Sequence, residues 1–279
     1  VGSEMCIRDS FITMLPQRVW NGAYSELMIA MPLFMLAGEL MNTGGITQRI
    51  INFCMELLRP IRGGLGEVNI VASMIFGGIQ GSGCADAAAI GGMLIPAMEK
   101  QGYDKDYSVA VTAGSSMLSP IIPPSIAMIL YSYYTEVPVG RLFMGALVPG
   151  ILLGLLQMGV VYLEYRLRKY DIPRTRFSLR NLLTTAWHSL GALMMPLIIL
   201  SGICFGIVTP TESGVLAILY GLLYGFCISK TLKWSDIPGI LIDSAVTTSV
   251  VYMTIVGAGV LSNVLVRPVS YTHLTLPTN

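Results

Sequence analysis

Two short stretches of the sequence combine residue types that bind small ions. The first, GSGCAD at Gly81–Asp86, joins glycines, which let the backbone approach an ion, with the hydroxyl of Ser82. The second, SPIIPPS at Ser119–Ser125, contains prolines that remove backbone donors and interrupt a helix. Interrupted helices present free carbonyls, which coordinate sodium, and N-termini, which attract anions. These stretches predict an ion or anion site, and the alternative for the glycines is a close contact between helices.

Two acidic residues in apolar surroundings are further candidates. Asp86 follows the glycines. Burying an ionisable side chain in a membrane costs free energy, so such residues are often functional. An acid at this position can also cap the helix that follows. Glu212, in TPTES at Thr209–Ser213, has the same two interpretations, and we favour the structural one. The sequence has no phosphate-binding glycine loop with its lysine, no paired His and Glu on a helix and no Gly-x-Ser-x-Gly motif. These observations argue against an enzyme and against an ATP-driven pump.

The composition indicates a membrane protein. Hydrophobic residues make up 53% of the chain and charged residues 12%, about half of the charge of a soluble domain. The net charge of +1 provides no basic surface for a nucleic acid. A crossing needs about 20 mostly apolar residues. The candidate crossings are Leu27–Met41, Leu142–Leu163, Ala186–Ile207, Ser213–Ile228 and Ile240–Leu265.

Apolar residues at helical spacing over Ile46–Ile61 predict an amphipathic helix. It would lie along the membrane surface or cover a neighbouring helix. The cysteines left between the two ends of the chain, Cys54, Cys84, Cys204 and Cys227, are singly spaced within apolar stretches. This spacing fits neither a metal site nor a disulfide framework, so we interpret them as small hydrophobic residues.

Both candidate ion-binding stretches interrupt long apolar segments. Val68–Met98 is too long for one crossing and is broken near its middle by glycines, which predicts two half-length helices forming a re-entrant hairpin. Tyr107–Tyr134 is broken at SPIIPPS, which predicts a discontinuous helix. Within a membrane, such breaks occur only where they line a cavity or are packed inside protein. The predicted fold is an all-α, multi-span membrane bundle with one re-entrant hairpin and one discontinuous helix.

The distribution of basic residues predicts the orientation. The loop between two candidate crossings contains Arg166, Arg168, Lys169, Arg174, Arg176 and Arg180. Loops rich in Lys and Arg face the cytoplasm. Alternation from this loop places most other basic residues on the same side, provided that Val68–Met98 enters and leaves on one side. Charge and length therefore both favour the re-entrant interpretation.

The two ends of the chain read differently from the rest. Residues 1–10 and 269–279 resemble translated sequencing adapters in opposite orientations. We therefore expect the membrane transport domain to occupy residues 11–268, as an internal piece of a longer gene, and we set both ends aside.

Several ordered motifs resemble one transporter family. They are MPLFMLAGELMNTGG (Met31–Gly45), IQGSGCADAAAIGGMLIPAM (Ile79–Met98), QGYDKDYSVAVTAGSS (Gln101–Ser116), SPIIPPSIAMILYSYYT (Ser119–Thr135), LFMGALVPG (Leu142–Gly150) and GIVTPTES (Gly206–Ser213). Together they are similar to the large permease subunit, the DctM type, of tripartite (TRAP-type) transporters. The resemblance runs from about Met31 to Val260.

This resemblance implies a multi-pass protein of the bacterial inner membrane that takes up an organic anion, with a carboxylate expected, coupled to sodium. The implied fold is that of the ion-transporter superfamily, with inverted repeats and elevator-like movement. This sequence would hold the first repeat and part of the second, so half of the expected site lies outside it. The implied partners are a small four-helix membrane subunit (DctQ-like) and an extracytoplasmic substrate-binding protein (DctP-like). No cofactor is implied beyond sodium as the coupling ion.

The resemblance also assigns candidate residues. Ion ligands would be Gly81, Ser82 and Gly83 in the hairpin and Ser119, Pro120 and Pro123 in the break. Asp86 and Ser125 are candidates for the substrate side. Gln80 and Gly83 stand where many members carry serine, and Ser119 where glycine is common, which leaves the set of ion ligands open. Two alternatives remain from the residues alone: a membrane channel, or a membrane-embedded enzyme that uses Asp86 or Glu212 as acid or base.

Overall fold

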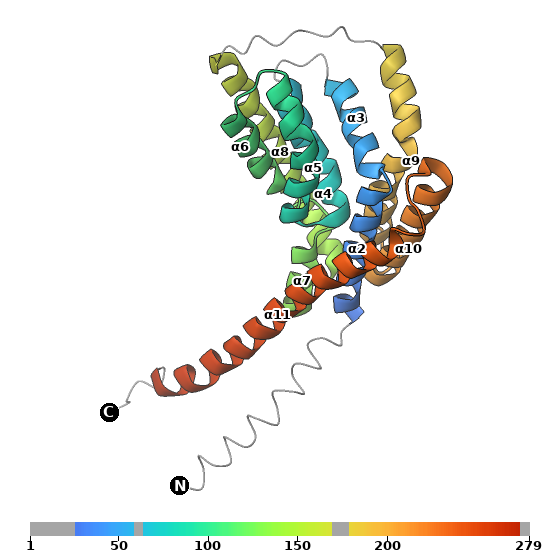
Figure 1. The fold of residues 1–279 in the computed structure, drawn as a ribbon. Coiled ribbons are helices and arrows are strands. Elements are labelled where there is room, and N and C mark those ends of the chain that lie inside the picture. Colours follow the sequence, from blue (N-terminus) through green and yellow to red (C-terminus); the bar gives the residue numbers. More distant parts are fainter. Residues whose placement is uncertain (1–25, 59–63, 169–178, 274–279) are drawn as a thin grey trace.

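The computed structural model describes residues 26–58, 64–168 and 179–273, and every regular element in these ranges is helical. The residues before and after these ranges, including most of the two ends set aside above and part of the basic loop, lie outside the description. The elements are α2 (Glu26–Thr43), α3 (Ile46–Leu58), α4 (Gly64–Gln80), α5 (Gly83–Lys100), α6 (Lys105–Ser116), α7 (Ile126–Thr135), α8 (Val139–Arg168), α9 (Leu179–Cys204), α10 (Pro210–Leu223), the π-helix η1 (Tyr224–Ser229) and α11 (Ile237–His273). Figure 1 shows them as an elongated helical bundle from which α11 projects at an angle.

α2 and α3 form a bent pair. Their axes differ by 67° at a break next to Gly44 and Gly45, and Gly45 has the positive φ of 75° that favours glycine. The apolar face of α3, including Ile50 and Cys54, is buried against α4 and α9. Of the two predictions for this amphipathic segment, the structure therefore supports the one in which it covers neighbouring helices.

The predicted hairpin is present. α4 and α5 are separated only by Gly81 and Ser82, and they pack against each other side by side (Figure 1). Gly81 has a φ of 61°, a conformation that reverses the chain and that other residues rarely adopt. Ser82 then caps α5, with its hydroxyl 3.5 Å from the amide nitrogen of Ala85. The sequence therefore turns the chain at the position expected from its glycines.

The predicted discontinuous helix is also present. α6 ends at Ser116 and α7 begins at Ile126, with turns and bends in between. Pro120, Pro123 and Pro124 lie in this break, and the Pro123–Pro124 peptide bond is cis. Because proline has no amide hydrogen, a continuous helix cannot form through this segment.

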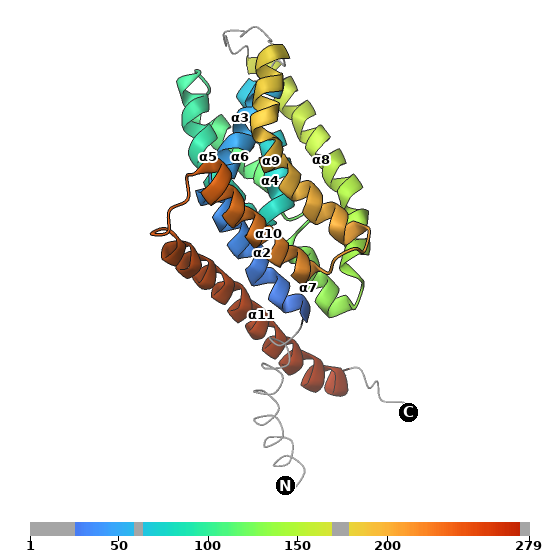
Figure 2. The ribbon, with the colours of Figure 1, turned by 90° about the vertical axis from the view of Figure 1, so that its right-hand side faces the viewer.

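The remaining helices provide the long crossings. Among the described residues, three helices are long and apolar enough to span a bilayer alone, and two bent pairs raise that number to five. The helices that are long and apolar enough to span a bilayer alone are α8, the α10–η1 unit and the first 23 residues of α11. Figure 1 shows α11 crossing α2 obliquely, and Figure 2 shows the two helices side by side. The Tyr252 hydroxyl in α11 donates to the Met28 carbonyl at 2.8 Å.

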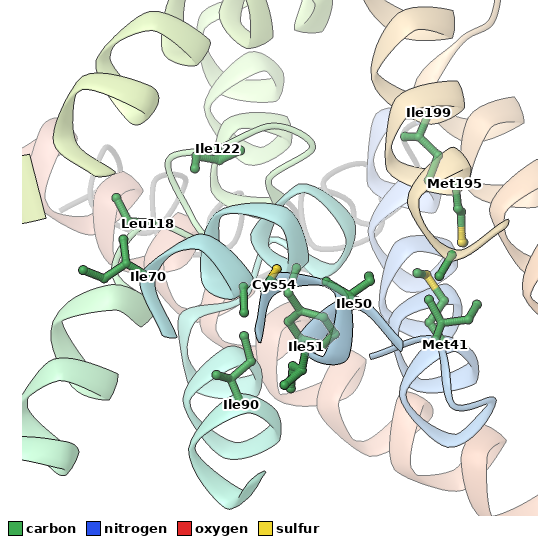
Figure 3. Packing of buried hydrophobic residues seen from close by; sticks show 14 of the residues in the cluster. Met41, Ile50, Ile51, Cys54, Ile70, Ile90, Leu118, Ile122, Met195 and Ile199 are labelled. Carbon is green, nitrogen blue, oxygen red and sulfur yellow. The ribbon is translucent and has the colours of Figure 1, made fainter. Parts of the chain in front are cut away.

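The core joins the hairpin, the break and α3. Figure 3 shows buried side chains from each: Ile50, Ile51 and Cys54 from α3, Ile70 and Ile90 from the hairpin, and Leu118 and Ile122 from the break. Met41, Met195 and Ile199 extend the same cluster to α2 and α9. In contrast, many apolar side chains of α8, such as Val148 and Val160, point outward with more than 60% of their surface exposed. Outward apolar faces of this kind suit contact with lipid.

Candidate functional site

The hairpin tip lies directly against the break between α6 and α7. A Cβ atom built on Gly81 would lie 2.7 Å from the Cα of Ser125, and one on Gly77 would lie 2.6 Å from the Cα of Ser119. A Cβ on Gly78 would lie 3.1 Å from the carbonyl oxygen of Pro123. The separations at Gly77 and Gly81 are too short for any Cβ atom, and the one at Gly78 is tighter than most real contacts, so the close approach of the two backbones depends on glycine at the first two positions.

Gly83 continues this contact at the start of α5. A Cβ there would lie 3.0 Å from the carbonyl oxygen of Ser116 and 3.7 Å from Cδ of Pro120. The structure therefore brings together the six candidate ion ligands, Gly81, Ser82, Gly83, Ser119, Pro120 and Pro123, at one junction of hairpin and break. We call this place the hairpin junction.

Four helix ends meet at the hairpin junction. α4 and α6 end there, and the carbonyls of their last turns carry partial negative charge. α5 and α7 begin there, and their first amides carry partial positive charge. One small volume thus offers carbonyl oxygens suited to a cation and amides suited to an anion.

Ser119 has the most distinctive side chain at the junction. It is fully buried, and its hydroxyl has no hydrogen-bond partner among the described residues. In a continuous helix the amide of residue 123 would donate to the Ser119 carbonyl. Pro123 has no amide hydrogen, so this carbonyl does not receive that bond. A buried hydroxyl without a partner is unfavourable unless something else binds it. Ser119 therefore provides two oxygen atoms that are suited to coordinating an ion.

Ser125 has a different environment. It is buried at the N-cap of α7, where its hydroxyl makes no capping bond and instead donates to the Pro120 carbonyl at 2.6 Å. This bond spans the break and takes up one of its carbonyls. Ser125 therefore fixes the shape of the break, and its oxygen lone pairs stay available as acceptors.

Asp86 lies one turn into α5, fully buried. Neither carboxylate oxygen has a hydrogen-bond partner among the described residues, although Ser73 of α4 is a polar neighbour. Its role as a helix cap, which the sequence left open, is not realised, because Ser82 occupies the capping position and the Asp86 side chain accepts no amide. Asp86 therefore lies behind the tip, with Ser73 of α4 as its polar neighbour.

Sequence reasoning missed a row of buried polar residues between α4 and α6. The Asn69 amide donates to the Thr112 hydroxyl at 2.7 Å, and the Ser115 hydroxyl donates to the Asn69 carbonyl at 2.9 Å. Ser73 donates to Ser115 at 3.2 Å and so extends the row toward Asp86. A signal was present in the sequence, since Asn69 and Ser73 are four residues apart in an apolar stretch and Thr112 and Ser115 are three apart.

Glu212 has the structural role that the sequence favoured. Thr209 caps α10 by accepting from the Glu212 amide at 3.2 Å, and the Glu212 carboxylate accepts from the Thr209 amide at 2.8 Å. Together these two bonds form a capping box. Glu212 lies on α10, an element that does not contribute to the hairpin junction.

The donor set of the junction suits a hard cation. It consists of carbonyl and hydroxyl oxygens, the ligand type that hard cations prefer. Among the residues that the structure describes, no cluster of three or more His, Cys, Asp or Glu side chains could hold a metal ion. Two cavities in the described part of the chain, of about 680 and 910 Å³, are lined by other residues and include none of the candidate ion ligands.

Comparison with known proteins agrees with this architecture. The family model described as the tripartite ATP-independent periplasmic transporter, DctM component, matches residues 5–274. The chain is 38% identical over 266 residues to the sialic acid TRAP transporter permease protein SiaT of Haemophilus influenzae, covering 92% of this chain and 43% of that protein. It is 36% identical over 238 residues to the C4-dicarboxylate TRAP transporter large permease protein DctM of Pseudomonas aeruginosa, covering 85% and 56%.

A third relative is the 2,3-diketo-L-gulonate TRAP transporter large permease protein YiaN of Escherichia coli, 34% identical over 253 residues, which cover 89% of this chain and 58% of YiaN. The chain thus spans about half the length of the curated relatives it matches. These relatives are transporter permeases rather than enzymes, and the helices described here are those of a multi-pass membrane protein. The family match over almost the whole chain and the helical hairpin seated on a broken helix lead to one conclusion: this chain belongs to the DctM family of tripartite ATP-independent periplasmic transporter permeases.

Proposed function

We propose that this chain is part of the large permease subunit of a transporter that imports an organic acid across the bacterial inner membrane, driven by a sodium gradient. The single observation that carries the proposal is the hairpin junction, where four helix ends and the free hydroxyl of Ser119 meet. Helix C-termini and free carbonyls favour a cation, and helix N-termini next to them favour an anion. Binding the sodium ion and the organic anion next to each other favours the binding of both, and this coupling is what a symporter requires.

The proposed roles follow the geometry. Gly81, Ser82, Gly83, Ser119, Pro120 and Pro123 would surround the sodium ion, with Ser119 supplying its hydroxyl. Asp86 and Ser125, one in α5 and one at the start of α7, would act on the substrate side. Half of the expected site would be contributed by the rest of the complete permease.

The substrate class is proposed from the relatives. Their names assign them sialic acid, C4-dicarboxylates and 2,3-diketo-L-gulonate, which are all organic acids. Another relative, from Oleidesulfovibrio alaskensis, is named for isethionate, which is a sulfonate. We propose a carboxylate, delivered by an extracytoplasmic binding protein, with a small membrane subunit bracing the permease. Uptake of a sulfonate, measured beside uptake of a carboxylate, tests this choice of substrate class.

The experiment is uptake by the complete transporter reconstituted in proteoliposomes. Accumulation of a carboxylate that needs both an inward sodium gradient and the binding protein is the expected result. Flux that is independent of any gradient would instead identify a channel, and chemical conversion of the solute would identify an enzyme. Sulfonate uptake in the absence of carboxylate uptake would overturn the substrate class and leave the sodium coupling standing.

A further inference from the structure

A cavity of about 910 Å³ lies between α6 and α8, on the side of the molecule where Figure 1 places these two helices next to each other. Its lining follows α6 from Asp104 to Ser115 and α8 from Leu153 to Arg168. The volume is within the range of about 300–1,000 Å³ that pockets for organic ligands occupy. It is separate from the hairpin junction and is lined by none of the residues assigned to the ion or the substrate above.

The lining changes from charged to apolar along the cavity. One end carries Asp104, Lys105, Asp106, Glu164 and Arg168. The other end is mostly apolar, with Gln157 and Ser115 as its polar residues and Ile70, Val111, Leu153, Leu156, Val160 and Val161 as its apolar ones. Leu156 and Val160 are 59% and 62% exposed, so the cavity opens onto the outward apolar face of α8. In a membrane this face meets lipid. A ligand that fits must have a charged head and an apolar tail.

The length of the cavity matches one leaflet of a bilayer. The α8 stretch from Leu153 to Arg168 is about 22 Å long at a rise of about 1.5 Å per residue. A bilayer is about 40–45 Å thick including its headgroups, so one leaflet measures about 20–22 Å. The charged end of the cavity lies at Arg168, the last residue of α8, and the positive-inside rule places this end of α8 at the cytoplasmic surface. The cavity therefore has the depth and direction of a phospholipid of the cytoplasmic leaflet.

The charged end of the cavity carries both acidic and basic side chains. Arg168 is held by Asp104 at 3.2 Å and Glu164 at 3.0 Å, which neutralises much of its charge. Lys105 and Asp106 also line the cavity, and neither forms an ion pair within the part of the chain that the structure describes. A free ammonium next to a free carboxylate complements a headgroup that carries a phosphate and an amine. Because carboxylates outnumber basic groups at this end, a headgroup with net negative charge is disfavoured.

We propose that this cavity binds one zwitterionic phospholipid with a primary-amine headgroup, of the phosphatidylethanolamine type. The phosphate lies at Lys105, the ammonium lies at Asp106, and one acyl chain runs along Leu156 and Val160. The lipid fills the space between α6, which leads into the break, and α8. It therefore supports the half-helix that positions Ser119 without contacting it.

The test uses the purified full-length permease together with its small membrane subunit, in nanodiscs of equal parts phosphatidylethanolamine and phosphatidylglycerol. After transfer to lipid-free detergent, native mass spectrometry identifies the lipids that remain bound. We expect one phosphatidylethanolamine to be retained by the parent protein. Val160→Trp should lower its retention by about tenfold, because the indole fills the space of the acyl chain. Val148→Trp, at an equally outward position of α8 outside the cavity, should leave retention unchanged.

A second pair of variants tests the headgroup. Asp106→Asn should reduce the preference for phosphatidylethanolamine over phosphatidylglycerol by about threefold, the scale of one exposed charge pair. Lys105→Gln should weaken the retention of both lipids without reducing this preference, because both carry the phosphate that is assigned to Lys105. Lys100 is an exposed lysine outside the cavity, so Lys100→Gln should leave the preference between the two lipids and their retention unchanged. Equal retention in Val160→Trp and Val148→Trp, or no lipid preference in the parent, would overturn the proposal. Loss of the small membrane subunit from Val160→Trp alone, with lipid content unchanged, would overturn it too, because the occupant is then a protein helix.

Discussion

Ser119 shows how an isolated side chain can distinguish binding from packing. Its hydroxyl is buried and has no hydrogen-bond partner among the described residues, whereas the equally buried Ser132 donates to the Val137 carbonyl at 2.6 Å. Removing a hydroxyl that bonds nothing in the protein costs little stability, and removing one that is bonded costs about 1 kcal/mol. The two serines therefore form a matched pair for experiment.

Ser119→Ala in the complete transporter should raise the sodium concentration for half-maximal uptake by about tenfold, the scale of one lost charge-assisted bond. Its melting temperature should remain that of the parent. Ser132→Ala should do the reverse, lowering the melting temperature with no change in sodium requirement. If Ser119→Ala left the sodium requirement unchanged, Ser119 would be removed from the ion site.

Gly81→Ala should lower the free energy of unfolding by about 3 kcal/mol, because an alanine at positive φ is strained and its Cβ would strike the Ser125 backbone. Gly92→Ala in α5 is the control. Gly92 is exposed and has no atom within 4 Å of the new Cβ, so alanine there should stabilise by about 0.5–1 kcal/mol. Chemical unfolding followed by circular dichroism measures both. Similar effects in the two variants would show that the tip and the break are not in contact.

Among the elements, α10 depends on its capping box rather than on any reaction of Glu212. Thr209→Ala removes the cap and should destabilise the protein by about 1 kcal/mol without altering sodium dependence. Glu212→Gln keeps the reach and the acceptor oxygen of the side chain, and it should retain transport. Complete loss of transport in Glu212→Gln, with normal folding, would restore an acid or base role for this residue.

The hairpin and the broken helix were predictable because their causes are local. Gly81 can adopt positive φ and Pro123 lacks an amide hydrogen wherever they occur, so the chain turns and breaks at these positions. The location of α3 was not predictable in the same way. Its apolar face fits a lipid surface as well as a protein surface, and only the position of α4 and α9 decides between them.

The same limit applies to the polar residues. Sequence reasoning singled out Asp86 as a cap or a functional group, but whether its carboxylate receives a hydrogen bond depends on Ser82 taking the capping position first. It overlooked Asn69 and Ser115, because single polar residues in an apolar stretch gain meaning only when another helix presents a partner. The π-helical end of α10 likewise had no local signal.

For the whole molecule, the orientation in the membrane is the prediction with the widest consequences. In a variant without native cysteines, a cysteine at Val137 should react only with an impermeant reagent added outside, and one at Pro173 only from the cytoplasmic side. Val137 follows α7, whereas Pro173 belongs to the basic loop beyond α8 and lies outside the described residues. The opposite sidedness would invert the assignment and would place the proposed lipid site in the outer leaflet.

The glycine contacts of the hairpin junction also determine which contacts of this protein can be detected as covarying positions in an alignment of related sequences. Pairs of residues usually covary when one side chain can change to compensate for the other. Gly77 and Gly81 meet Ser119 and Ser125 through backbone atoms, and no exchange at 119 or 125 makes room for a side chain at 77 or 81. The closest long-range contact at this site should therefore be invisible to covariation. A deep mutational scan should find Gly77 and Gly81 intolerant individually, with no second substitution that rescues them.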